Sequence, residues 1–180
     1  MLSGASGSMS RLQYRMFPSP INNNNFSFIL ISDTHANINP KIFNLISSTD
    51  YVIHAGDIVD YQIIESIKLI CRDIYAVNGN NDGYKELRDI EEISTPIGDI
   101  IVTHGDKHYP DYHHSLREMF PKALMVIYGH SHEHIIDTTK KPYIINPGAA
   151  GTTRTNGGAS CVLIKNNNDG LSINLRKFNN

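Results

Sequence analysis

Seven side chains that could bind a divalent metal ion occur along this chain of 180 residues, each at or just after the end of a short apolar run. The set contains two carboxylates, one amide and four imidazoles: Asp33, His35, Asp57, Asn80, His104, His130 and His132. Mixed oxygen and nitrogen donors suit Mn²⁺, Fe²⁺, Co²⁺, Ni²⁺ and Zn²⁺, whereas Ca²⁺ and Mg²⁺ favour shells of oxygen alone. Seven donors are too many for one open tetrahedral site. They are enough for two ions that share a carboxylate, so the residues predict a two-metal site.

Paired metal ions have a specific chemical use. In two-metal sites the ions lie about 3.5–4 Å apart and stabilise both the attacking and the leaving oxygen of an in-line displacement. The D-x-H and H-x-H spacings at 33–35 and 130–132 suit extended backbone, in which residues two apart point to the same side. Each pair alone more often marks solvated residues, and Asn80 alone is more often a turn residue. Because all seven recur in order at the ends of apolar runs, the ligand interpretation is favoured.

The apolar runs predict the elements that would position these side chains. In the first half, three runs rich in β-forming residues alternate with two stretches of helical periodicity. The predicted strands are 26–32, 51–56 and 73–79, and the predicted helices are 40–48 and 62–73. This order implies parallel strands joined by right-handed crossovers. The carboxyl ends of such strands meet at one edge of a sheet, where ligands of open α/β folds bind.

The second half of the chain is richer in strands. Further strands are predicted at 99–105, 123–129, 142–148, 160–166 and 171–178, with one helix around 112–120. A short polar segment separates the last two strands, which should therefore pair as an antiparallel hairpin. We expect one layered α/β domain over residues 26–180, parallel in its first half and mixed or antiparallel in its second.

Composition argues against several classes of protein. The formal net charge is −2 with both signs mixed along the chain, which gives no electrostatic reason to expect binding to long nucleic acids. No apolar stretch approaches the ~20 residues of a membrane span, and no secretory signal is visible. Cys71 and Cys161 are expected to be reduced thiols, with a single disulfide as the minor alternative. These features predict a cytoplasmic protein.

Residues 1–25 are expected to lie outside the folded domain. The segment begins with small residues and ends in a run of asparagines, Asn22 to Asn25, a composition typical of a disordered tail. Its first eight residues also look like the remnant of a recombinant leader, with Met9 as the natural start.

The motifs together resemble the calcineurin-like metallophosphoesterase superfamily. Its blocks D-x-H, G-D, G-N-x-[DE], H-G and G-H-x-H appear here at 33–35, 56–57, 79–82, 104–105 and 129–132. Within it the chain is most similar to the short, single-domain YfcE-type phosphodiesterases, whose N-P-G segment resembles residues 145–154. The resemblance extends from Phe26 to about Leu175. It implies a four-layer α/β/β/α sandwich with metal ions at the strand ends.

The resemblance also implies roles for the candidate ligands. One ion would be held by Asp33, His35, Asp57 and His132, and a second by Asp57, Asn80, His104 and His130. Asp57 would bridge the ions, and a water or hydroxide between them would be the nucleophile. Asp57, Asn80 and His104 are the residues expected to act most directly in catalysis. The implied activity is hydrolysis of small phosphate esters, with Mn²⁺ expected and Ni²⁺, Fe²⁺, Co²⁺ or Zn²⁺ as alternatives.

One position departs from the pattern of many superfamily members. Those enzymes carry a histidine after the G-N pair, near the leaving group as a proton donor, and this chain has Asn81. An amide cannot act as a general acid near neutral pH, so esters whose leaving groups must be protonated should react slowly. YfcE-type members also commonly lack this histidine, so Asn81 agrees with the subgroup. Asp82 is interpreted as a turn residue or as a support for the ligands.

Other polar residues near the motifs have plainer interpretations. His54 is expected to be a buried histidine hydrogen-bonded to backbone, with an orienting contact to Asp57 as the alternative. Arg154 could contact a substrate phosphate or be a solvated charge, and His134 is unassigned. Surface positions are expected for His108, His113 and His114, with the border of a substrate cleft as the alternative, and turn or capping roles for Asp60 and Asp106.

Two other functions fit parts of the pattern. A non-catalytic, protein-binding scaffold of the same fold exists in a subunit of the eukaryotic retromer complex, which has an altered metal-site pattern. The complete ligand set here favours an enzyme. A structural or redox metal protein is disfavoured, because closed structural sites prefer cysteine-rich shells of four ligands. The expected partner is a small phosphate ester, with no membrane, and a homo-oligomer remains an open alternative.

Overall fold

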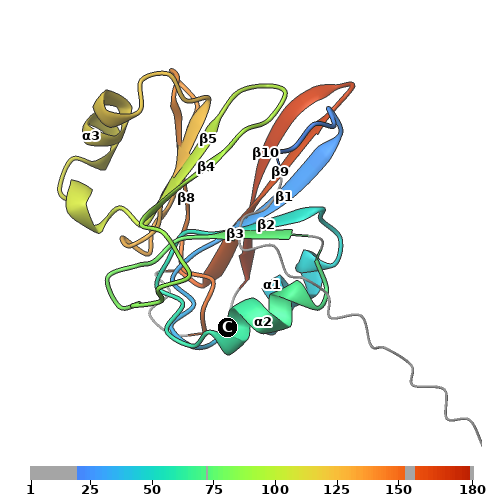
Figure 1. Ribbon diagram of the computed structural model, residues 1–180, viewed down its shortest axis with the longest axis vertical. Coiled ribbons are helices and arrows are strands. Elements are labelled where there is room, and N and C mark those ends of the chain that lie inside the picture. Colours follow the sequence, from blue (N-terminus) through green and yellow to red (C-terminus); the bar gives the residue numbers. More distant parts are fainter. Residues whose placement is uncertain (1–19, 72, 153–156, 179–180) are drawn as a thin grey trace, which may run out of the picture.

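The computed structural model describes residues 20–71, 73–152 and 157–178 (Figure 1). Its strands are β1 (Phe26–Ile31), β2 (Tyr51–His54), β3 (Asp73–Ala76), β4 (Ile90–Ile93), β5 (Ile100–Thr103), β6 (Met125–Ile127), β7 (His134–Asp137), β8 (Tyr143–Pro147), β9 (Ala159–Asn167) and β10 (Gly170–Phe178). Its helices are α1 (Pro40–Ile46), α2 (Gln62–Lys68) and α3 (Tyr112–Met119), and η1 (Asp106–His108) is a 3₁₀ turn. Helix α1 starts where the sequence predicts a start: Pro40 has no N–H to satisfy, and Asn39 Oδ1 accepts the Lys41 N–H at 2.9 Å.

The strands form two five-stranded sheets. In the first, β10-β9-β1-β2-β3, strands β1, β2 and β3 run parallel, and β9 pairs antiparallel with both β1 and β10. In the second, β4-β5-β6-β8-β7, strands β5, β6 and β8 run parallel between antiparallel edge strands. The predicted parallel first half, mixed second half and closing hairpin are therefore confirmed.

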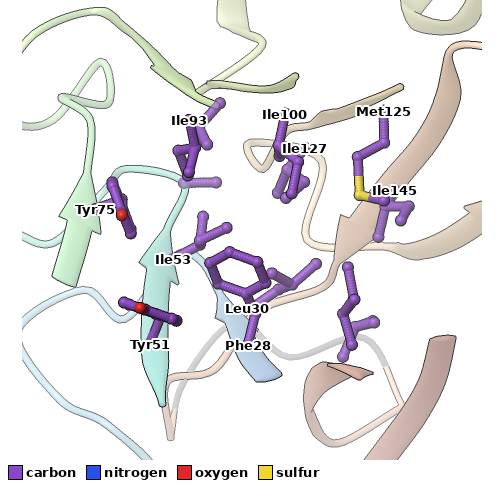
Figure 2. Close-up of a cluster of buried hydrophobic side chains, with 14 of the residues drawn as sticks. Phe28, Leu30, Tyr51, Ile53, Tyr75, Ile93, Ile100, Met125, Ile127 and Ile145 are labelled. Carbon is purple, nitrogen blue, oxygen red and sulfur yellow. The ribbon is translucent and has the colours of Figure 1, made fainter. Parts of the chain in front are cut away.

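The sheets pack face to face, and helices cover their outer faces. Along β1 the side chains alternate: Phe28 and Leu30 point toward the other sheet, whereas Ile29 and Ile31 pack against α1 and α2. Figure 2 shows the cluster between the sheets, where side chains of β1, β2 and β3 meet those of β4, β5, β6 and β8. Helix α3 lies on the far side and packs Leu116 against the second sheet. The predicted four-layer α/β/β/α sandwich is confirmed.

The structure differs from the predicted elements at two edge strands and at the start of the fold. Strand β4 has the sequence IEEI and was not predicted, because its two glutamates disfavour a strand. Its Ile93 is fully buried. Strand β7 begins two residues after His132, in a segment for which the sequence predicts no strand. Ile21 is buried and its N–H donates to Ser94 O at 3.1 Å, so folded structure begins before Phe26. Residues 1–19 of the expected tail lie outside the described residues.

Two further expectations concern the whole chain. Within the described ranges, no helix is long and apolar enough to cross a membrane. Cys161 is buried and Cys71 is partly buried, and both are free thiols, as predicted.

The segments that follow the central strands are held side by side. The Asp33 N–H donates to Gly56 O and the His35 N–H to Asp57 O, each at 3.0 Å, so the chain continues the β1–β2 pairing beyond the strands. In the second sheet, the Gly129 N–H donates to His104 O at 2.9 Å. The ends of β1, β2, β5 and β6 therefore carry their motif residues to one edge of the sandwich.

Two motif glycines are required by close packing at this edge. A Cβ atom on Gly79 would collide with the backbone nitrogen and the carboxylate of Asp57. A Cβ atom on Gly129 would collide with Ser32 Oγ and lie 2.9 Å from Asp33 Oδ2. The glycines of G-N and G-H thus allow neighbouring loops to approach the two candidate carboxylate ligands.

His54, the last residue of β2, connects two of these loops. Its side chain is fully buried, and Nδ1 accepts the Gly56 N–H at 3.2 Å. The neutral ring therefore carries its hydrogen on Nε2, which lies 3.0 Å from Thr34 Oγ1, and Thr34 donates onward to Ile58 O at 3.3 Å. The predicted backbone-bonded role of His54 is confirmed, and its orienting contact is with Thr34 rather than Asp57.

Burial of His54 should make stability depend on pH. Burial lowers the pKa of His54 to about 4, below the value of about 6.5 in an unfolded chain. As pH falls below about 6.5, His54 becomes protonated in the unfolded chain but stays neutral in the folded protein. The contribution of His54 should therefore lower the free energy of unfolding by roughly 3 kcal/mol between pH 6.5 and 4. Urea unfolding of the metal-free protein should show a shallower fall for His54→Gln than for the parent.

His134→Gln is the matched control, since it removes a histidine from the half-buried start of β7. This variant should keep the parent's pH slope. An equally steep fall in His54→Gln and the parent would contradict the assignment.

Candidate metal centre

The structure brings all seven predicted ligands to one edge of the sandwich, but not on extended backbone. Five of them have positive φ angles between 45° and 66°: Asp33, His35, Asp57, His130 and His132. The expectation of extended D-x-H and H-x-H segments was wrong, because these residues lie in tight turns beyond the strand ends. Left-handed backbone costs a non-glycine residue about 1–2 kcal/mol. Such strain persists only where the surroundings dictate the geometry, and it concentrates at functional sites.

One group of donors gathers around the carboxylate of Asp33. Its Oδ1 lies 3.3 Å from His132 Nε2, which in turn lies 3.1 Å from His35 Nε2. His35 Nε2 is 3.8 Å from Asp57 Oδ2. Donors that share an ion at about 2.0–2.2 Å lie roughly 3–3.5 Å from one another. The spacing of this first cluster, Asp33, His35, His132 and Asp57 Oδ2, fits a common cation.

A second group of donors gathers around the amide oxygen of Asn80. Asn80 Oδ1 lies 3.0 Å from His104 Nε2 and 2.9 Å from His130 Nδ1. His104 Nε2 is also 3.4 Å from Asp57 Oδ1. In this second cluster, Asn80, His104, His130 and Asp57 Oδ1, the spacing again fits a shared cation. Asp57 presents one carboxylate oxygen to each cluster.

The tautomer of His104 supports a positive charge in the second cluster. Its Nδ1 lies 2.8 Å from Ala55 O, and a carbonyl oxygen can only accept, so Nδ1 carries the hydrogen. In the neutral ring, Nε2 then presents a lone pair to Asn80 Oδ1, which is another acceptor. Two acceptors 3.0 Å apart repel each other unless a proton or a cation lies between or beside them.

The buried carboxylate of Asp33 supports a positive charge in the first cluster. The side chain is fully buried, and within the described residues the partner of Oδ1 is His132 Nε2 at 3.3 Å, too poorly aligned for a regular hydrogen bond. Burial favours the neutral acid, but His132 and His104 nearby outweigh it and lower the pKa of Asp33 from its usual value. An ionised, buried oxygen whose nearest partner is a poorly aligned imidazole is only partly satisfied, whereas a cation would satisfy it. The residues present therefore fit divalent metal ions.

Residues between and behind the ligands fix the loops that carry them. Asp82 accepts three backbone N–H groups, from Gly79 at 2.9 Å, Val59 at 2.8 Å and Ile58 at 3.1 Å, so it ties the G-N loop to the G-D loop. This confirms its interpretation as a support for the ligands. The sequence signal for Asp82 was its place in the G-N-x-[DE] block, two residues after Asn80.

Asn146 is a supporting residue whose role sequence reasoning missed. It is fully buried, and its Nδ2 donates to Gly129 O at 2.8 Å and to Ser131 Oγ at 3.0 Å. Its Oδ1 accepts the Gly148 N–H at 2.9 Å, so these three amide contacts hold the G-H-x-H loop and the turn that follows Asn146. The N-P-G motif was visible, but only the fold places it behind His130 and His132.

Asn81 also contacts the shared carboxylate. Its backbone N–H donates to Asp57 Oδ1 at 2.9 Å and its Nδ2 to Asp57 Oδ2 at 2.7 Å. Both oxygens of Asp57 therefore keep their orientation toward the two clusters. The residue that replaces the histidine of many relatives thus positions a candidate ligand.

The remaining predicted residues lie around the clusters. His108, the last residue of η1, is buried, and its Nδ1 lies 2.7 Å from Ser115 Oγ, so the expected surface position was wrong. His113 and His114 lie on α3 and pair with Asp137 and Glu118, at 3.2 and 3.4 Å. Asp60 Oδ1 accepts the Gln62 N–H at 2.9 Å in the turn before α2, and Asp106 is the first residue of η1. His134 is the first residue of β7, and Arg154 lies outside the described residues.

The sequence has clear relatives. Residues 26–169 match the model of the calcineurin-like phosphoesterase superfamily domain. The chain is 36% identical over 141 residues to phosphodiesterase MJ0936 of Methanocaldococcus jannaschii, covering 66% of this chain and 81% of that protein. It is 32% identical over 137 residues to the probable metallophosphoesterase MJ0623 of the same organism, covering 69% and 68%.

Solved structures share the fold. Wild-type Vps29 of Entamoeba histolytica complexed with zinc superposes with a TM-score of 0.70 at 18% identity, covering 85% of this chain and 99% of that one. A structure described as a novel archaeal phosphodiesterase superposes with a TM-score of 0.70 at 23% identity, covering 84% and 99%. The predicted resemblance and the predicted class, a phosphoric ester hydrolase, are confirmed by the family model and the curated relatives. The chain belongs to the calcineurin-like phosphoesterase superfamily.

Proposed function

We propose that this protein is a phosphodiesterase that uses two divalent metal ions to hydrolyse small phosphate esters. The observation that carries the proposal is the carboxylate of Asp57, whose two oxygens face two separate donor clusters at 3.8 and 3.4 Å. One carboxylate shared between two sets of donors is an arrangement that suits a pair of neighbouring ions. The phosphodiesterase MJ0936, at 36% identity, supports the same activity.

The two clusters would hold one ion each, with Asp57 common to both. Mn²⁺ is our proposed metal, because the donors mix carboxylate, amide and imidazole, and Fe²⁺, Co²⁺, Ni²⁺ and Zn²⁺ suit the same set. When bound, the ions would supply Lewis acidity toward a phosphoryl oxygen and would lower the pKa of a water molecule between them.

The protein's own groups orient the site. Ala55 O fixes the His104 ring through Nδ1, and Asn81 fixes both oxygens of Asp57. Asn80 contributes a neutral donor, so the second cluster carries less negative charge than the first and leaves more net positive charge for a phosphate. The Asp57 side chain is almost fully buried, so bulk water does not compete with the metal ions for its carboxylate.

A protein-binding scaffold is the second candidate, because the fold superposes on Vps29. That likeness, at 18% identity, concerns the fold alone. The complete set of seven donors, together with the 36% identity to the phosphodiesterase MJ0936, favours an enzyme. A cytoplasmic location is part of the proposal.

The first prediction concerns metal removal. After chelation, the protein should contain no bound metal and should not hydrolyse bis(p-nitrophenyl) phosphate. Readdition of Mn²⁺ should restore two ions per chain, measured by elemental analysis, together with activity. Full activity of the metal-free protein would contradict the proposal, and two bound ions without activity on any ester would favour the scaffold.

The second prediction compares the shared carboxylate with a ligand of one cluster. Asp57→Asn should cost more activity than His35→Asn, because it removes charge from both clusters and presents an N–H₂ group to the donors of Asn81. Loss of groups that merely orient ligands costs about 10–100-fold, so we expect Asp57→Asn to cost more than about 100-fold in kcat/KM. Melting temperature and metal content serve as controls, and parent-like metal content and turnover in both variants would refute the assignment.

The third prediction concerns Asn81 and the leaving group. Without a proton donor, diesters that release p-nitrophenolate should react faster than alkyl diesters, by as much as the ~10²–10⁴-fold that general acids contribute. Asn81→His should raise kcat/KM for an alkyl diester more than for a nitrophenyl diester. Asn81→Ala is the matched control, since it also loses the hydrogen bond to Asp57 but adds no donor. Equal changes for both esters in the two variants would show that position 81 does not face the leaving group.

A further inference from the structure

A cleft of about 430 Å³ opens beside the second cluster. Asn80 and His104 form its inner end, and its walls continue outward over the start of β4, the 3₁₀ turn η1 and the end of α3. Pockets that bind small organic groups are commonly about 300–1,000 Å³. The cleft therefore has room for an organic group attached to a phosphate that lies at the donors.

The inner wall of the cleft is fixed. Thr103, His104 and His108 are all buried, with at most 8% of each residue exposed. The bond of 2.7 Å between His108 Nδ1 and Ser115 Oγ ties η1 to α3, so these two sides of the cleft keep their separation. A preformed wall of this kind lowers the entropy cost of binding a ligand.

Two apolar side chains line the outer part of the cleft. Ile90 on β4 and Met119 on α3 are 42% and 54% exposed, and both belong to the few large apolar residues that reach solvent in the described part of the chain. Exposed apolar groups beside a polar site are typical of ligand-binding clefts. The thioether of methionine packs well against aromatic rings. The outer part of the cleft thus suits a flat or apolar group.

The charges of the cleft disfavour a second anionic group. Among the described residues, its lining includes the carboxylates of Asp82, Asp89 and Asp106 and one ammonium, that of Lys107. Lys107 Nζ lies 3.3 Å from Asp89 Oδ2 at the exposed rim, so these two charges offset each other and the carboxylates of Asp82 and Asp106 are left. Away from the metal donors, an additional phosphate or carboxylate on the ligand would lie near the Asp106 carboxylate and would be repelled by it.

We propose that this cleft binds one organic group of the phosphate ester, and that it selects an uncharged group of about the size of an aromatic ring. Ile90 and Met119 would determine this specificity by packing on the faces of the group. The inference rests on the proposed function, because it takes the phosphate to lie at the two donor clusters.

Direct binding of two phosphonates tests the cleft independently of turnover. Isothermal titration of the Mn²⁺-loaded protein should give tighter binding of phenylphosphonate than of methylphosphonate. Met119→Ala and Ile90→Ala should each weaken phenylphosphonate about three- to tenfold and leave methylphosphonate within about twofold, because only the ring reaches these side chains. Leu69→Ala is the matched control, since Leu69 is an apolar residue, 79% exposed, at the end of α2 and should change neither constant.

A charged ring tests the electrostatic part. 4-Carboxyphenylphosphonate should bind the parent more weakly than phenylphosphonate does, and Asp106→Asn should reduce that difference. Two results would overturn the cleft assignment while leaving the metal centre intact. One is equal affinity for phenylphosphonate and methylphosphonate, and the other is unchanged binding of phenylphosphonate to both Met119→Ala and Ile90→Ala. Failure of the metal-loaded protein to bind either phosphonate would overturn the proposed function as well.

Discussion

The position of the Asp57 carboxylate is the constraint on which the rest of the site depends. Its two oxygens must face two donor clusters at once, so neither the backbone nor the side chain of Asp57 can move independently of them. The residue accordingly has left-handed backbone, is almost fully buried and is hydrogen-bonded twice by Asn81. Gly79 is a glycine because any side chain there would displace this carboxylate.

The fold meets this constraint by bringing two sheets together at one edge. Asp33, Asp57 and Asn80 follow strands of the first sheet, whereas His104 and His130 follow strands of the second. The apolar cluster between the sheets fixes their separation, and therefore the distance between donors that are far apart in the chain (Figure 2). Buried polar contacts then set the loops, above all those of His54, Asp82 and Asn146. The membership in the calcineurin-like phosphoesterase superfamily follows from the same motifs.

The ligand types and the layered fold could be predicted because apolar periodicity and residue chemistry are local properties. The D-x-H and H-x-H segments were predicted as extended, because a spacing of two residues is the same in a strand and in a turn with positive φ. Strand β4 was hidden by Glu91 and Glu92, which an edge strand tolerates. The burial of His108 and the cleft beside Asn80 depend on packing among β4, η1 and α3, which no local pattern specifies.

The central claim is that two ions share Asp57, and the most direct measurement is anomalous diffraction from crystals of the Mn²⁺-loaded protein. The account predicts two anomalous peaks about 3.5–4 Å apart. One should lie among Asp33, His35 and His132 and the other among Asn80, His104 and His130, with the Asp57 carboxylate between them. A single peak within one cluster, or two peaks of which neither contacts Asp57, would contradict the account.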